Sequence, residues 1–151
     1  MLNRANLVGN QAARTPQQLA YLGDAVWSLH VRCKYLTPPK QFASYRSSAE
    51  RHVSAAKQAA YLDSLLASGW QLTPAEAQLV EWAQRTPSSS LTLRAKYSAA
   101  GGQQGAYRRA TAFEALLGHL SLEDPPRLQE LLQRLDPALA DVDRRDGAGG
   151  R

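Results

Sequence analysis

Apolar residues recur at intervals of three and four along most of this chain, the spacing that predicts amphipathic helices. The first run is Leu19, Leu22, Val26, Leu29 and Cys33. It follows Thr15-Pro16-Gln17-Gln18, which has the form of a helix-capping box with proline at the first helical position. A helix is therefore expected from residue 16 to about residue 36, with Cys33 on the apolar face and inside the core.

The same spacing predicts further helices and few other elements. They are expected from Ser47, with Glu50 as its capping partner, to Gly69; from Thr73-Pro74 to Pro87; and over residues 107–122 and 127–135. Residues 86–105 contain turn formers without a period and predict a long loop, and the polar residues 141–151 predict disorder. No segment alternates with a period of two, so the fold class is all-α. The expected organisation is an N-terminal extension over 1–14, a helical domain over 15–135 and a flexible tail over 136–151.

Charge distinguishes the body of the chain from its end. The 151 residues carry a net charge of +5, and residues 1–122 hold thirteen bases and six acids whereas residues 123–151 hold five and seven. Residues 25–49 and 82–113 contain bases and no acid. A basic body favours a polyanionic partner such as a nucleic acid. Single bases more often solvate a helix face, so only the acid-free stretches carry weight.

Two carboxylates stand apart from other charges on these helices. Asp24 is the only acid between residues 1 and 49, and Glu114 is the only acid between residues 82 and 122. Neither has a charged neighbour three or four residues away on its own helix. Two carboxylates on a basic body suit a hard divalent cation such as Mg²⁺ and hydrolysis of a phosphodiester, although a hydrogen-bonded structural acid is an equally simple reading. Gly23 beside Asp24, and Gly118 near Glu114, indicate close helix contact, with Gly23 expected at a contact between subunits.

Other chemistries have less support in the sequence. His30, His52 and His119 fall on three different helical segments without metal-ligand spacing, and each is expected to be a surface or hydrogen-bonded histidine. The single Cys33 excludes an internal disulfide framework and favours a reducing, cytoplasmic setting. No apolar run is long enough to span a membrane, and the N-terminal residues lack the apolar stretch of a secretory signal.

Three segments in order resemble a known family. Residues 19–26, LAYLGDAV, resemble the catalytic helix of the ribonuclease III fold, and residues 113–118, FEALLG, resemble its second acidic helix. Residues 51–59, RHVSAAKQA, lie between them and resemble the small branch of that family, which lacks a double-stranded RNA-binding domain. The 29 residues that follow Leu122 are too few for such a domain.

This resemblance implies an all-helical, homodimeric, Mg²⁺-dependent endoribonuclease that acts on double-stranded RNA and leaves 5′-phosphate ends. Asp24 and Glu114 would be the catalytic, metal-binding carboxylates, and Leu22, Gly23 and Val26 would lie at the dimer contact. The expected substrate is precursor 23S ribosomal RNA in a bacterial cytoplasm or a plastid, with a ribosomal protein as a further candidate partner. The bases expected to contact RNA are Lys57, Arg85, Arg94, Lys96, Arg108 and Arg109.

The chain departs from full-length ribonuclease III at two acidic positions, where it has Ala20 and Thr111. The number of bound ions is therefore open, and the Thr111 hydroxyl could still hold a metal-bound water. Residues 85–89, RTPSS, also replace an expected basic, asparagine-containing segment. Two other functions stay under consideration: a ribonuclease III-like domain that binds structured RNA without cutting it, and a helical protein adaptor.

Overall fold

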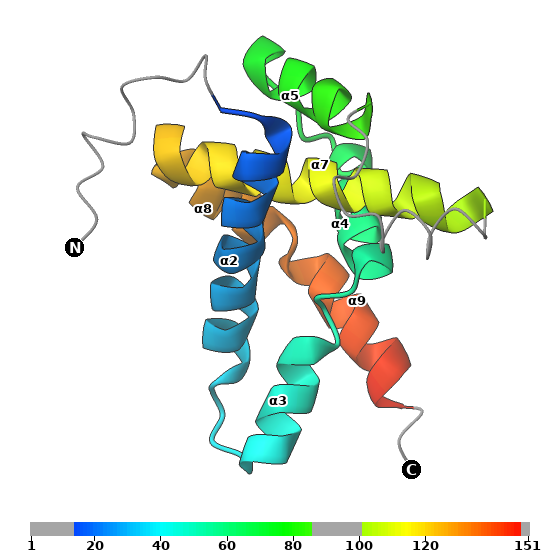
Figure 1. The fold of residues 1–151 in the computed structure, drawn as a ribbon. Helices are drawn as coiled ribbons and strands as arrows, with labels where there is room; N and C mark the ends of the chain where they lie inside the picture. Colours follow the sequence, from blue (N-terminus) through cyan, green and yellow to red (C-terminus); the bar gives the residue numbers. More distant parts are fainter. Residues whose placement is uncertain (1–13, 86–100, 149–151) are drawn as a thin grey trace.

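The computed structural model describes residues 14–85 and 101–148, and its regular elements in those ranges are all helices, without a strand (Figure 1). Its helices are α2 (Pro16–Tyr35), α3 (Phe42–Glu50), α4 (Ala55–Ala67), α5 (Pro74–Arg85), α7 (Gly101–Glu123), α8 (Pro125–Arg134) and α9 (Asp136–Gly147). Among these, no helix combines the length and apolarity needed to cross a membrane. The predicted all-α class is confirmed.

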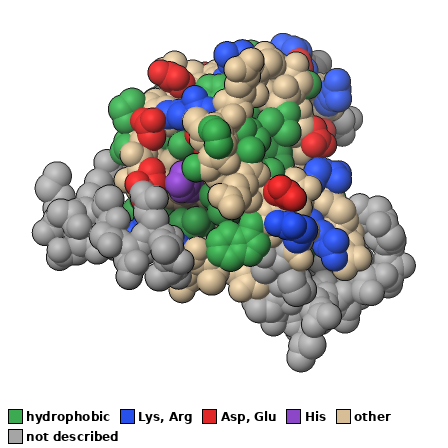
Figure 2. All heavy atoms as spheres, turned by 90° about the horizontal axis from the view of Figure 1, so that it is seen from above, with side chains coloured by type: hydrophobic (Ala, Val, Ile, Leu, Met, Phe, Trp, Pro, Cys, Tyr) green, Lys and Arg blue, Asp and Glu red, His purple; other side chains and the backbone are tan. Residues whose placement is uncertain are grey.

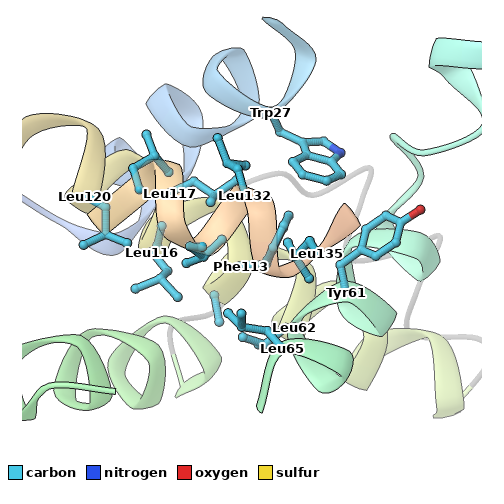
Figure 3. Close-up of a cluster of buried hydrophobic side chains, with 14 of the residues drawn as sticks. Trp27, Tyr61, Leu62, Leu65, Phe113, Leu116, Leu117, Leu120, Leu132 and Leu135 are labelled. Carbon is cyan, nitrogen blue, oxygen red and sulfur yellow. The ribbon is translucent and has the colours of Figure 1, made fainter. Parts of the chain in front are cut away.

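Helix α7 is the central element, and α2, α4 and α5 pack around it (Figure 1). Its middle is mostly apolar, and Ala112, Phe113, Ala115, Leu116 and Leu117 have no exposed surface. A helix that buries apolar residues on several sides lies inside a domain. The ring of Phe113 lies edge-on to Trp27 of α2, 5.1 Å between centroids, and both belong to the cluster shown in Figure 3.

Two helix starts agree with the local sequence. The Thr15 side chain accepts a hydrogen bond from the backbone N–H of Gln18, and the Gln18 side chain accepts one from the backbone N–H of Thr15. Thr73 and Glu76 exchange the same pair of bonds at the start of α5. Both capping boxes are confirmed, because they involve groups only three residues apart.

The apolar face predicted for the first helix is only partly right, since Leu19 is buried and Val26 packs against the core but Leu29 and Cys33 are exposed. Helix α2 buries Leu19, Ala20, Gly23, Trp27 and Val31. Cys33 is exposed instead of lying in the core, and Leu29 keeps 65% of its surface. Helix α2 has apolar residues on two sides, and the side that holds the large Trp27 ring is the one packed against α7.

The predicted helix from Ser47 to Gly69 is two helices. Helix α3 already begins at Phe42, and the chain leaves the helical path after Glu50 and resumes at Ala55, with Ser54 as the cap. The imidazole of His52 is fully buried at this break, and the backbone carbonyl of His52 accepts a hydrogen bond from the Trp27 indole N–H at 2.9 Å. These tertiary contacts override the local capping signal at Ser47.

Two segments predicted as irregular are partly helical. Helix α7 starts at Gly101, within the predicted loop 86–105, whereas residues 86–100 lie outside the described ranges. The tail predicted to be flexible over 136–151 forms helix α9 as far as Gly147, and Leu139 there is fully buried. Asp143 of α9 also accepts hydrogen bonds from Tyr35 at 2.6 Å and Arg51 at 3.1 Å, so contacts distant in sequence hold this polar helix in place.

Candidate active site at the crossing of α2 and α7

Two glycines allow α2 and α7 to touch backbone to backbone. A methyl group built at Gly23 would overlap the Glu114 carbonyl, and one built at Gly118 would overlap the Leu19 carbonyl. Each glycine therefore marks a position where only a hydrogen atom fits between the helices. The tight contact predicted at Gly23 is confirmed, and it forms within one chain, against the backbone of Glu114.

This crossing brings the two isolated carboxylates together. Asp24 follows Gly23 on α2 and is exposed, whereas Glu114 on α7 is largely covered. Burial and, second, the negative charge of nearby Asp24 together raise the pKa of Glu114 to about 7, against a lowering by the Gln58 amide. A buried carboxyl group whose negative charge is disfavoured beside a second carboxylate is a suitable place for a cation, which would stabilise the ionised form.

The two positions where acids were missing offer no further carboxylate. Ala20 is 5% exposed and belongs to the core. Thr111 is half-buried, and its hydroxyl donates a hydrogen bond to the Tyr107 carbonyl at 3.0 Å, which leaves the oxygen able to accept one. Within the described ranges, no three side chains of the His, Cys, Asp and Glu types cluster as a metal site.

Sequence reasoning did not single out Gln58, which the structure places beside Glu114. Gln58 lies on α4, is 2% exposed, and interacts with the Glu114 carboxyl. A signal was present in the sequence, because Gln58 is a polar residue one helical turn before the core residue Leu62.

The bases predicted to contact RNA are spread over several helices. Lys57 pairs with Asp146 at 2.9 Å, Arg109 with Asp63 at 3.6 Å and Arg85 with Glu81 at 3.5 Å. Arg108 is exposed on α7, and Arg94 and Lys96 lie outside the described ranges. Arg85 also lines a pocket of about 320 Å³ together with Arg14, Trp82 and His119.

The surface seen in Figure 2 mixes Lys and Arg side chains with acidic and hydrophobic ones. Of the predicted contact residues that the structure describes, Lys57, Arg85 and Arg109 are each paired with an acid of the same chain. Exposed ion pairs of this kind contribute little to stability.

The residues proposed for a dimer contact differ in their exposure. Gly23 is buried inside the protomer, whereas Leu22 and Val26 are half-buried. Large exposed apolar side chains also occur on α2, at its C-terminal end and at the start of α3, namely Tyr21, Leu29, Leu36 and Phe42 at 86%, 65%, 59% and 73% exposure. Exposed apolar side chains in this number are typical of an interaction surface when they lie together.

Fold and site together define a class: an all-helical domain with a carboxylate pair at the crossing of its central helix and its first helix. Comparison of structures supports the fold, since a crystal structure of a protein from Fusobacterium nucleatum matches with a TM-score of 0.66 over 83% of this chain and 95% of that one, at 21% identity. The ribonuclease III domain model matches residues 17–125. The chain therefore belongs to the ribonuclease III family.

Relatives in this family are also of similar size. The protein named Mini-ribonuclease 3 from Thermosynechococcus vestitus is 40% identical over 123 residues, which cover 80% of this chain and 72% of the relative. The Mini-ribonuclease 3 of Brevibacillus brevis is 33% identical over 138 residues, or 88% of this chain and 93% of that protein. The resemblance to the small branch of the family, seen first in three short segments, is confirmed.

Proposed function

We propose that this protein is a Mg²⁺-dependent endoribonuclease that cuts double-stranded RNA. The observation that carries the proposal is the crossing of α2 and α7, where Gly23 and Gly118 bring Asp24 and Glu114 together. Membership of the ribonuclease III family and the Mini-ribonuclease 3 relatives support a nuclease. The base-paired ends of precursor 23S ribosomal RNA are the proposed substrate, as the likeness to the small branch implies.

The donor set at the crossing fits a hard divalent cation. Mg²⁺ is commonly held by one or two carboxylates together with waters and substrate phosphates. When bound, Mg²⁺ would supply an activated water and offset charge developing on the scissile phosphate. Asp24 is the accessible carboxylate, and Glu114 holds its proton up to about pH 7 unless a cation displaces it. Cation binding at this pair therefore releases a proton near neutral pH, and it strengthens as the pH rises through 7.

RNA contact is proposed to rest on shape and phosphates, because A-form duplexes expose 2′-hydroxyls and phosphates and little readable sequence. Arg108 is exposed, while Lys57, Arg85 and Arg109 would exchange their carboxylate partners for phosphates. Binding by such exchange weakens steeply with added salt.

A homodimer is part of the same proposal. The apolar side chains exposed on α2 and α3, together with Leu22 and Val26, offer a surface that a second copy would cover. Two copies would place two carboxylate pairs on one duplex, so that both strands are cut.

The test is cleavage of a stem-loop of ribosomal RNA by the Asp24→Asn and Glu114→Gln variants, with and without Mg²⁺. Both variants should lose cleavage but still bind the duplex, and wild-type products should carry 5′-phosphate and 3′-hydroxyl ends. Glu130→Gln, which alters an exposed carboxylate on α8, is the matched control and should cut at the wild-type rate. Cleavage by either site variant at a rate near wild type would refute the assignment. RNA binding without cleavage by the wild-type protein would favour the non-catalytic RNA-binding module instead.

A further inference from the structure

The core-facing side of α4 contains one polar side chain among apolar ones. Gln58, Leu62 and Leu65 follow each other at helical spacing and are 2%, 1% and 0% exposed. A leucine or methionine would suit such a position by size and polarity. Among the described residues, the Gln58 Nε2 has no hydrogen-bond partner of normal geometry. Burying an amide donor without a partner costs about 1–3 kcal/mol, so its presence calls for a physical reason.

The reason is the Glu114 carboxyl group of α7, which lies beside Gln58 of α4. The Gln58 amide is close enough to the Glu114 carboxyl to lower its pKa, against the burial and the Asp24 charge that raise it. The backbone of Glu114 is fixed by Gly23, but its side chain has three rotatable bonds, so the backbone contact alone does not orient the carboxylate. A donor from α4, which packs against α7 separately from α2, supplies the missing constraint.

We propose that Gln58 is a positioning residue, whose Nε2 donates to the ionised Glu114 carboxylate and orients it toward Asp24 so that the pair can hold a divalent cation. This inference rests on the proposed function of the same site. Gln58 acts through Glu114 and need not touch the cation or the RNA. Groups that orient a metal-binding side chain in this way typically change metal affinity by about 10- to 100-fold when removed.

The test is the affinity of the full-length protein for Mn²⁺ alone, without RNA, measured by titration calorimetry. Gln58→Met keeps the length of the side chain and removes the donor. It should weaken Mn²⁺ binding by about 10-fold or more. Thermal stability should stay the same or rise, because an unpaired buried donor disappears. The matched control is Leu62→Met, one turn further along the same helix, which changes packing without touching the carboxylate and should keep the wild-type affinity.

The outcomes separate this inference from the function on which it rests. One outcome is that the wild type binds Mn²⁺, that Asp24→Asn abolishes this binding, and that Gln58→Met binds as tightly as the wild type. This outcome would refute the role of Gln58 while the cation site stands. Equal weakening by Leu62→Met would assign the effect to packing and would also refute it. If the wild type does not bind Mn²⁺, or Asp24→Asn binds it equally well, the cation site and the role of Gln58 fail together.

Discussion

Replacing Gly118 by alanine should separate the two helices that carry the carboxylates. The added methyl group would lie on the Leu19 carbonyl oxygen and 2.9 Å from its carbonyl carbon. Carbon atoms in favourable contact are about 3.5–4.0 Å apart, so α2 and α7 must move by roughly 1 Å. Overpacking usually costs about 1–3 kcal/mol, and here the obstacle is backbone, which cannot rotate away as a side chain would. We expect a loss of about 3 kcal/mol and, for a domain of this size, a Tm lower by roughly 6–12 °C.

The measurement is urea and thermal unfolding of Gly118→Ala followed by circular dichroism. Gly105→Ala is the matched control on the same helix, because its methyl group would meet only a flexible Arg109 side-chain nitrogen at 3.4 Å. Alanine is the better helix former, so this control should gain about 0.5–1 kcal/mol. Equal stabilities for the two variants would refute the reasoning about backbone contact. RNA cleavage by Gly118→Ala should also fall, since the same displacement moves Glu114 away from Asp24.

The remaining predictions concern the C-terminal helix, pH and the dimer surface. Asp143→Ala removes the acceptor of hydrogen bonds from three side chains, and Asp143 is 30% exposed. We therefore expect the free energy of unfolding, measured in urea, to fall by about 2 kcal/mol. A change below about 0.5 kcal/mol would contradict the role of Asp143 in holding α9 against the domain. Burial lowers the pKa of His52, so at this residue the unfolded chain binds more protons than the folded one below about pH 6.5, and the contribution of His52 to stability should fall as the pH decreases from there. Thermal melting of Glu114→Gln, which lacks the opposing contribution of Glu114, should show this fall. The raised pKa of Glu114, about 7, makes its ionised form destabilising in the folded protein, so its contribution to stability changes with pH in the opposite direction. Glu114→Gln should therefore be more stable than the wild type at pH 8, by roughly 1–3 kcal/mol. This gain should vanish below about pH 4.5, where the carboxyl is protonated in both the folded and the unfolded state. Leu29→Glu should shift the sedimentation profile from dimer to monomer. The Tm of the protomer should stay nearly unchanged, since Leu29 is 65% exposed. An unchanged sedimentation profile would exclude this face of α2 from the dimer interface.

Several features of this fold were accessible from short stretches of sequence. The capping boxes at Thr15 and Thr73 fixed the starts of α2 and α5, because their hydrogen bonds join groups three residues apart. The isolation of Asp24 and Glu114 among apolar and basic neighbours marked both as unusual before any contact was known. The neighbouring glycines also indicated that their helices would touch closely.

Other features depend on residues far apart in the chain. Which of the two apolar sides of α2 is buried was decided by the packing of Trp27 against Phe113 and Tyr61, and periodicity alone selected the side that contains Cys33. The break after Glu50 and the helix α9 follow from the burial of His52 between Tyr61 and Asp143, at 2.5 and 2.9 Å. A polar segment such as α9 becomes ordered only when distant partners supply the energy that its own composition lacks.

The sequence by itself determined the helical class, the family and the two carboxylates, since each is encoded in the identity and spacing of neighbouring residues. Only the tertiary structure decided that Gly23 serves a contact within one chain, that Glu114 has a pKa of about 7, and that Gln58 lies beside it. These properties arise from burial and from charges on different helices. Burial and the distance between charges depend on how the helices pack in space, which the residue spacing along one helix does not determine.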